Sequence, residues 1–125
     1  MKPLTFPPRP APAPPLLKVS VSAQGTSQIV TVSGELDVSR TTEVGNVIDR
    51  ALAERPETLL LDLSELEFCD SSGVHLILRT NSRTEIGRTR FLVIPPTGAA
   101  RRVFDLCCVE DYVTFVAVPG DAACA

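Results

Sequence analysis

Strict alternation of apolar and polar residues marks the start of the folded part of the sequence. From Leu17 to Ala23 every second residue is apolar, which is the period of a strand with one buried face. A short turn with a glycine follows, and the β-branched run QIVTVSG predicts a second strand. Because so short a turn reverses the chain, we expect the two strands to pair as an antiparallel hairpin.

Three helical patterns then alternate with further strands. Apolar residues recur at helical spacing over residues 39–55, and Asp37 or Ser39 is expected to cap that helix. A second helix is predicted after the polar turn CDSSG, ending near Gly87, and a third is predicted to begin near Thr97. Strands are predicted before, between and after these last two helices, from the runs TLLLDL, RFLVIPP and YVTFVAV.

The predicted order of elements is β-β-α-β-α-β-α-β. Strands that alternate with helices are joined by right-handed crossovers onto one sheet, so we predict an α/β fold with a mixed sheet of about five strands. Three helices can cover mainly one face of such a sheet and leave the other partly open. The functional surface of an open α/β sheet lies beyond the carboxyl ends of its strands, where we expect the loops GELDVS and FCDSSG.

Length and composition limit the domain organisation. A chain of 125 residues suits one domain, which we place at residues 16–118, with a flexible end over residues 119–125. Prolines crowd residues 1–15 and block both helix and ladder hydrogen bonds, so this segment is predicted to be an extended or disordered tail. A role for the tail as a ligand of proline-recognition domains is the alternative.

Charge and cysteine usage exclude several classes of function. The formal net charge of -3 has the wrong sign for holding a polyphosphate, so we expect no direct nucleic-acid partner. The four cysteines form neither a C-x-x-C pair nor a zinc-like cluster with the single histidine, so we expect free thiols, no metal and no cofactor. No apolar run is long enough to span a bilayer, and we predict a cytoplasmic protein.

The segment CDSSG is the strongest candidate for chemistry. Asp70, Ser71 and Ser72 follow a buried strand and occupy the first turn of the next helix, where free amides and the helix dipole favour an added phosphate. Gly73 is expected to let another backbone approach closely. Since Asp and Ser are also the commonest helix caps, D-S-S-G by itself favours an ordinary helix start.

Two segments together resemble the STAS domain family, specifically the bacterial anti-sigma factor antagonists. They are SGELD at residues 33–37 and DLSELEFCDSSG at residues 62–73, and the resemblance runs from about Leu16 to Val118. It implies a STAS-like fold and a partner switch. The unmodified antagonist binds an anti-sigma factor that is also a serine kinase and so frees the sigma factor, until phosphorylation ends that binding. A serine phosphatase would reset the switch.

The resemblance also implies roles for individual residues. Ser71 matches the phosphoacceptor, Ser72 and Gly73 are its motif neighbours, and Asp70 would help to shape the turn. A phosphate adds about 1.5 to 2 negative charges at one point, which a complementary partner surface would reject without any global rearrangement. Three residues of the first segment would lie on the adjacent loop of the same docking surface: Gly34, Glu35 and Asp37. For Asp37, a plain helix cap is the alternative.

Several features depart from the family pattern or stay open. His75 stands where the family commonly has a small residue, so it either alters the docking surface or is a tolerated surface residue. A redox role for Cys69 would need a stabilised thiolate, which burial and Asp70 both oppose. Two arginine pairs either face an acidic partner or form a solvated surface: Arg79 with Arg83, and Arg101 with Arg102.

Three other functions compete with the partner switch. An enzyme would need Ser71, His75 and Asp70 as a triad, but these residues follow one another along one turn and helix instead of converging from different elements. A STAS domain can also serve, without phosphorylation, as a sensing module of a sensory or lipid-transfer complex. A nucleotide site lacks both glycine-rich phosphate-binding motifs. The sequence does not identify the sigma factor, kinase, phosphatase, upstream signal or oligomeric state.

Overall fold

The computed structural model describes residues 17–117. The predicted proline-rich tail over residues 1–15 and the predicted flexible end over residues 119–125 lie outside the described residues. The first predicted strand lies wholly within the described residues, and the last, YVTFVAV, lies within them except for Val118.

The predicted hairpin is confirmed. Strands β1 (Lys18–Gln24) and β2 (Ser27–Leu36) pair in antiparallel fashion along their whole common length. Gly25 in the intervening turn has a φ of 59°, a conformation that glycine adopts without steric cost. The predicted buried face of β1 is wrong, because its residues are exposed apart from the half-buried Val19, as an edge strand with one neighbour allows. In β2 every second residue from Val30 onward is buried.

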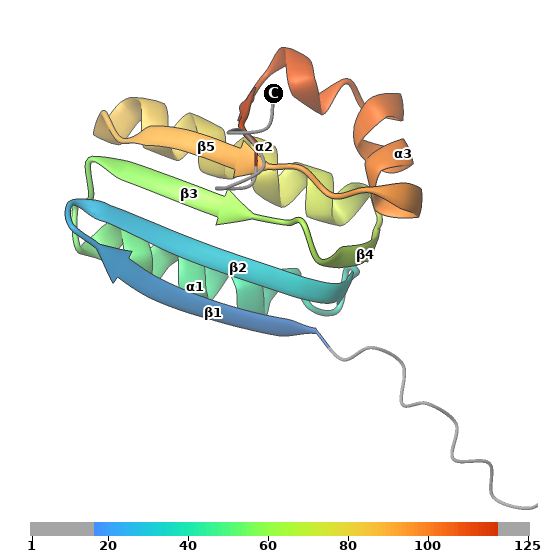
Figure 1. The fold of residues 1–125 in the computed structure, drawn as a ribbon, viewed down its shortest axis with the longest axis horizontal. Coiled ribbons are helices and arrows are strands. Elements are labelled where there is room, and N and C mark those ends of the chain that lie inside the picture. The colour runs from blue at the N-terminus through green and yellow to red at the C-terminus, as the bar shows by residue number, and fades with distance from the viewer. Residues whose placement is uncertain (1–16, 118–125) are drawn as a thin grey trace, which may run out of the picture.

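The remaining elements complete a mixed sheet (Figure 1). Strands β2, β3, β5 and β6 lie parallel to one another in the order β1-β2-β3-β5-β6, so only β1 runs antiparallel to its neighbour. A single turn of 3-10 helix precedes β6. The bounds are α1 Thr41–Ala53, β3 Thr58–Asp62, β4 Leu66–Cys69, α2 Ser71–Gly87, β5 Arg90–Ile94, α3 Gly98–Leu106 and β6 Thr114–Phe115.

Strand β4 was not predicted from the sequence, which gives about five strands where the described residues form six. Its four residues are buried, exposed, exposed and buried, so they show no alternation of period two. Strand β4 pairs only with the last residues of β2, beyond the end of β3, and the pairing is irregular between Gly34 and Glu35. Tertiary pairing rather than local pattern makes this segment a strand.

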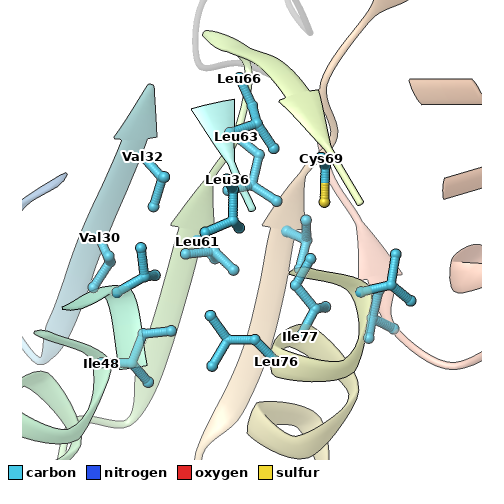
Figure 2. Packing of buried hydrophobic residues seen from close by; sticks show 14 of the residues in the cluster. Val30, Val32, Leu36, Ile48, Leu61, Leu63, Leu66, Cys69, Leu76 and Ile77 are labelled. Carbon is cyan, nitrogen blue, oxygen red and sulfur yellow. The ribbon is translucent and has the colours of Figure 1, made fainter. Parts of the chain in front are cut away.

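Helices α1 and α2 lie on the same face of the sheet, as predicted (Figure 1). Figure 2 shows the core between them and the strands, where Val30, Leu36 and Leu61 point toward Ile48 of α1 and Ile77 of α2. All five of these side chains are at most 1% exposed. No described helix covers the opposite face of the sheet, and α3 packs instead against β4.

The ends of the helices differ in part from the predictions. Helix α2 ends at Gly87, as predicted, and Thr97 is the N-cap residue of α3. The prediction that Asp37 or Ser39 caps α1 is wrong, because its N-cap residue is Arg40 and no side chain caps it. Asp37 and Ser39 hydrogen-bond to each other instead, which closes the loop on itself before the helix begins.

Candidate functional site

The pairing of β2 with β4 brings the two motif segments together. Leu36 lies opposite Cys69, and the backbone amide of Asp70 donates to the carbonyl oxygen of Leu36 at 3.3 Å. Residues 33–37 therefore run beside the strand that leads into the CDSSG turn. Both segments end at the carboxyl edge of the sheet, where open α/β folds place their functional surfaces.

The first motif segment lies deeper than its predicted loop position. Gly34 and Glu35 belong to strand β2, and Gly34 is buried while Glu35 is half-buried, so the prediction that both lie on a loop is wrong. Gly34 has a φ of 93° at the irregularity in the pairing with β4, a conformation that side chains other than glycine rarely adopt. Only Asp37, which is half-buried, reaches the loop.

Asp70 organises the start of α2. It is the N-cap residue, and its Oδ1 accepts hydrogen bonds from the Ser72 amide at 3.0 Å, the Gly73 amide at 3.4 Å and the Ser72 hydroxyl. Burial alone would raise the pKa of Asp70, but these bonds and one from the Val38 backbone outweigh burial and lower it. The carboxylate is therefore ionised at neutral pH, and it joins the β2–α1 loop to the helix.

The two motif serines have different surroundings. Ser71 is the first residue of α2, is exposed, and its hydroxyl makes no hydrogen bond within residues 17–117. Ser72 is half-buried and its hydroxyl donates to Asp70. Only the Ser71 hydroxyl is thus free for modification without breaking an internal contact.

Gly73 has close neighbours that differ from the expected ones. A β-carbon at this buried position would overlap the Sγ of Cys69 and lie 3.1 Å from a Leu36 methyl carbon. The expectation that another backbone approaches Gly73 is wrong, because the close atoms belong to side chains. The glycine allows the first turn of α2 to sit directly on the core.

Cys69 is a core residue with an unreactive thiol. Its side chain points into the interior (Figure 2), and its Sγ donates to the carbonyl oxygen of Asp70 at 3.3 Å. Burial is the main cause that raises the pKa of the Cys69 thiol to about 12, and the nearby Asp70 and Cys107 add to it. Since the thiolate is the reactive form, this cysteine lacks the property that a redox handle needs.

A repeated Asp-x-Ser turn, which the sequence analysis missed, closes three strands at the same edge. In each turn Oδ1 of the aspartate accepts from both the amide and the hydroxyl of the serine two residues later. The signal is visible in the sequence as a threefold D-x-S spacing, but only the last turn begins a helix. The turns are Asp37–Ser39 after β2, Asp62–Ser64 after β3 and Asp70–Ser72 after β4.

Two exposed apolar side chains flank the Asp70 junction and were also missed. Val38 in the β2–α1 loop is 72% exposed, and Phe68 in β4 is 43% exposed. The backbone of Val38 hydrogen-bonds to the Asp70 carboxylate, and Phe68 lies two residues before it. We call Val38, Phe68 and Ser71 the junction surface. The only sequence signal for the junction surface is Val38, an apolar residue inside a polar loop.

His75 does not complete a catalytic triad. It is exposed one turn after Ser71, but the described residues show no hydrogen bond from His75 to Asp70 or to Ser71. The Oδ1 of Asp70 already accepts the hydrogen bonds that cap α2. Within residues 17–117 no cluster of three or more His, Cys, Asp or Glu could hold a metal ion, and no helix is long and apolar enough to cross a membrane.

Comparison with known proteins gives the family. The model of the STAS domain matches residues 18–122, most of the chain. The chain belongs to the STAS domain family. This STAS domain is 27% identical over 95 residues to the anti-sigma-F factor antagonist RsfB of Mycobacterium tuberculosis, an alignment that covers 75% of this chain and 76% of RsfB.

Solved structures share the fold of this STAS domain. The crystal structure of an anti-sigma factor antagonist from Mycobacterium paratuberculosis matches with a TM-score of 0.77 and 26% identity, covering 90% of this chain and 95% of that one. The Bacillus cell fate determinant SpoIIAA in its phosphorylated form matches with a TM-score of 0.63 and 21% identity, covering 87% and 96%. The six-stranded sheet and its helices thus form a STAS-like fold.

The Asp70 cap makes stability depend on pH. We expect Asp70→Ala to lower the free energy of unfolding by about 1 to 2 kcal/mol at pH 7, because three hydrogen bonds to the cap are lost. The lowered pKa of Asp70 means that the charged form stabilises the fold above about pH 4. This advantage is lost as the pH falls through the pKa of the folded state.

Urea denaturation at pH 7 and at pH 3 measures the difference between wild type and Asp70→Ala. Asp37→Ala is the matched control, since Asp37 makes the same kind of turn without capping a helix, and its effect should be smaller. A gap between wild type and Asp70→Ala that is equally wide at both pH values would contradict the assignment.

Proposed function

We propose that this STAS domain is an anti-sigma factor antagonist that works by partner switching. The unphosphorylated domain binds an anti-sigma factor with serine kinase activity and so frees the sigma factor. Phosphorylation of Ser71 abolishes that binding, and a serine phosphatase restores it. The observation on which the proposal rests is the exposed, unbonded Ser71 hydroxyl at the junction surface. The names of RsfB and of the phosphorylated SpoIIAA structure support it.

The junction surface suits a protein partner that distinguishes the two states. Its exposed Val38 and Phe68 side chains gain from being covered by another protein, since burial removes apolar area from water. A phosphate on Ser71 would add a dianion to the junction surface, next to the ionised Asp70. A partner that covers this surface would have to bury an unpaired charge, which can cost about 3 kcal/mol, or more than a hundredfold in affinity.

The fold itself is expected to tolerate the modification. The hydroxyl of Ser71 makes no internal hydrogen bond among the described residues, so adding phosphate breaks none of them. The first turn of α2 also presents its positive dipole end to that position. The proposed role is that of a binding protein in the cytoplasm, where sigma factors work, and it calls for no catalytic residue, cofactor, metal or direct contact to nucleic acid.

Phosphate transfer from the partner tests the acceptor directly. An anti-sigma kinase from the same cells is purified, incubated with ATP and either wild type, Ser71→Ala or Ser72→Ala, and the intact masses are measured. Wild type and Ser72→Ala should each gain one phosphate, because Ser72 is held by Asp70, whereas Ser71→Ala should gain none. Circular dichroism confirms that all three are folded.

The opposite labelling pattern would refute the acceptor assignment. Phosphate on Ser71→Ala but not on Ser72→Ala would make Ser72 the acceptor. If the kinase binds the domain but labels neither serine, the alternative is a STAS interaction or sensing module that works without phosphorylation.

A further inference from the structure

A cavity of about 500 Å³ opens beside Ser72, the neighbour of Ser71, between the start of α1 and the outer side of α2. The titratable side chains that line it are a histidine and an arginine, and no aspartate or glutamate lines it. The remaining lining residues supply three hydroxyls and one leucine. The six residues are Thr41, Ser72, His75, Leu78, Arg79 and Ser82.

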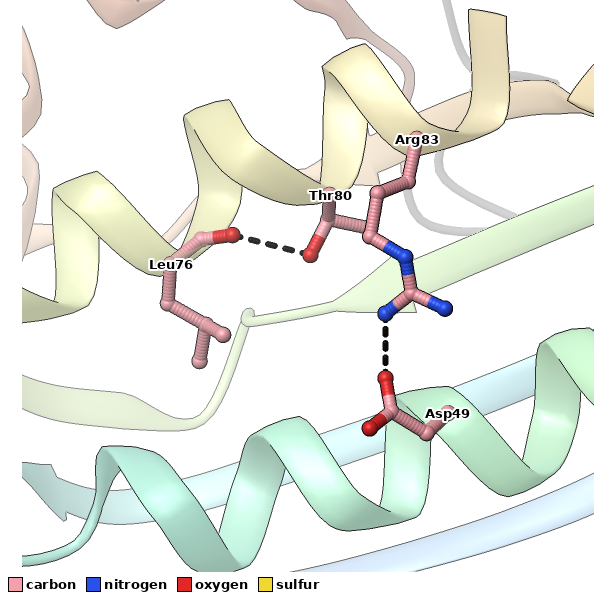
Figure 3. A network of polar contacts seen from close by, with 4 residues as sticks. All are labelled: Asp49, Leu76, Thr80 and Arg83. Atoms are coloured by element: carbon pink, nitrogen blue, oxygen red, sulfur yellow. Dashed lines mark hydrogen bonds and ion pairs between the residues drawn. The ribbon is translucent and has the colours of Figure 1, made fainter. Parts of the chain in front are cut away.

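The arginine of this cavity, Arg79, forms no ion pair with any described residue. Within residues 17–117 no acidic side chain forms an ion pair with Arg79. Arg83, one turn further along α2, instead donates from Nη1 to Asp49 of α1, as Figure 3 shows. The two arginines that the sequence suggests as a pair therefore differ: Arg83 forms an ion pair with Asp49, whereas Arg79 forms no ion pair among the described residues, although it lines a neighbouring cavity together with the same Asp49.

Spacing along α2 directs these groups toward Ser71. Ser71, His75 and Arg79 follow one another at intervals of four residues, and all three are exposed, so they form one stripe on the outer side of the helix. Side chains on an α-helix lean toward its N-terminus and cover the preceding turn. His75 therefore leans toward Ser71, and Arg79 leans toward His75.

We propose that His75 and Arg79 bind the phosphate of phosphorylated Ser71 and so hold the phosphorylated state of this domain. The inference rests on the proposed phosphorylation of Ser71 and adds the groups that receive the phosphate. An arginine and a protonated imidazole supply donors and positive charge to a phosphate dianion. They oppose the repulsion from the acidic groups of this end of the domain, which are Asp70 at the cap and Asp37 on the β2–α1 loop.

The ionisation of the phosphate itself provides the test. The protein is made with phosphoserine encoded at position 71, so that no kinase is needed, and its phosphorus resonance is followed against pH. Phosphoserine loses its second proton near pH 6, and nearby cations lower that midpoint. We expect the midpoint in the double variant His75→Gln/Arg79→Gln to lie about half a pH unit above wild type, with smaller rises in the single variants.

Arg102→Gln is the matched control, because Arg102 is an exposed arginine on α3 and lies outside the cavity lining. Its midpoint should equal that of wild type. An identical midpoint in wild type and the double variant would overturn the inference.

The two proposals fail in distinguishable ways. If the anti-sigma kinase does not label Ser71, the proposed function fails while the titration of the encoded phosphoserine stays measurable. If the kinase labels Ser71 but the phosphorus midpoint is insensitive to both substitutions, the partner switch stands and the role of His75 and Arg79 is wrong.

Discussion

Ser71→Glu is expected to weaken binding to the anti-sigma factor by more than about a hundredfold. The change places a permanent negative charge in the junction surface, next to the ionised Asp70 and on the same surface as two exposed apolar side chains. Burying that charge without a partner can cost about 3 kcal/mol, and every 1.4 kcal/mol is a factor of ten in the dissociation constant. Isothermal titration calorimetry with the purified anti-sigma factor measures the loss.

Two further variants separate the effect of position from the effect of charge. Ser71→Ala should bind like unmodified wild type and should stay bound when ATP is added, because it cannot be phosphorylated. Ser22→Glu adds the same charge to an exposed serine of β1, which pairs with the amino-terminal part of β2, far along the strand from the junction surface. It should bind normally. Equal affinity of Ser71→Glu and Ser22→Glu would eliminate the proposed switch.

Gly73→Ala is expected to lower the free energy of unfolding by about 1 to 3 kcal/mol. The added methyl group would overlap the Sγ of Cys69 and press on Leu36, both of which are fully buried. To relieve this overlap, either the core side chains or the first turn of α2 must move. A movement of the first turn would displace Ser71. Chemical denaturation measures the stability, and the rate of phosphate transfer to Ser71 reports on the turn.

A double-mutant cycle tests whether Cys69 is the cause. In a Cys69→Ala background the Gly73→Ala change should cost less, because the colliding sulfur is gone, and a coupling energy above about 0.5 kcal/mol is expected. Gly87→Ala is the control, since nothing lies within 4 Å of a β-carbon built there. Strictly additive losses at positions 69 and 73 would show that the sulfur does not set the requirement for glycine.

The periodic parts of the fold could be predicted from the sequence. Alternation and a short turn predict the hairpin, helical spacing predicts α1 and α2, and a start near Thr97 predicts α3. Strand β4 could not be predicted, since its four residues have no periodic pattern and depend on pairing with β2. The prediction of the α1 cap is wrong for a related reason. Asp37 can hydrogen-bond to Ser39 or to the helix, and the loop geometry selects Ser39.

For the candidate site, the sequence by itself determined the chemical groups and their order: an aspartate, two serines and a glycine after a strand, with a histidine and an arginine spaced along the following helix. Those properties are local, since capping and helical spacing act over a few residues. Only the tertiary structure decided that Ser71 is free while Ser72 is held, that Val38 and Phe68 are exposed, and that Arg83 rather than Arg79 forms an ion pair. Exposure and ion pairing depend on segments far apart in the chain, such as α1 beside α2 and β2 beside β4, and no short stretch of sequence contains both partners.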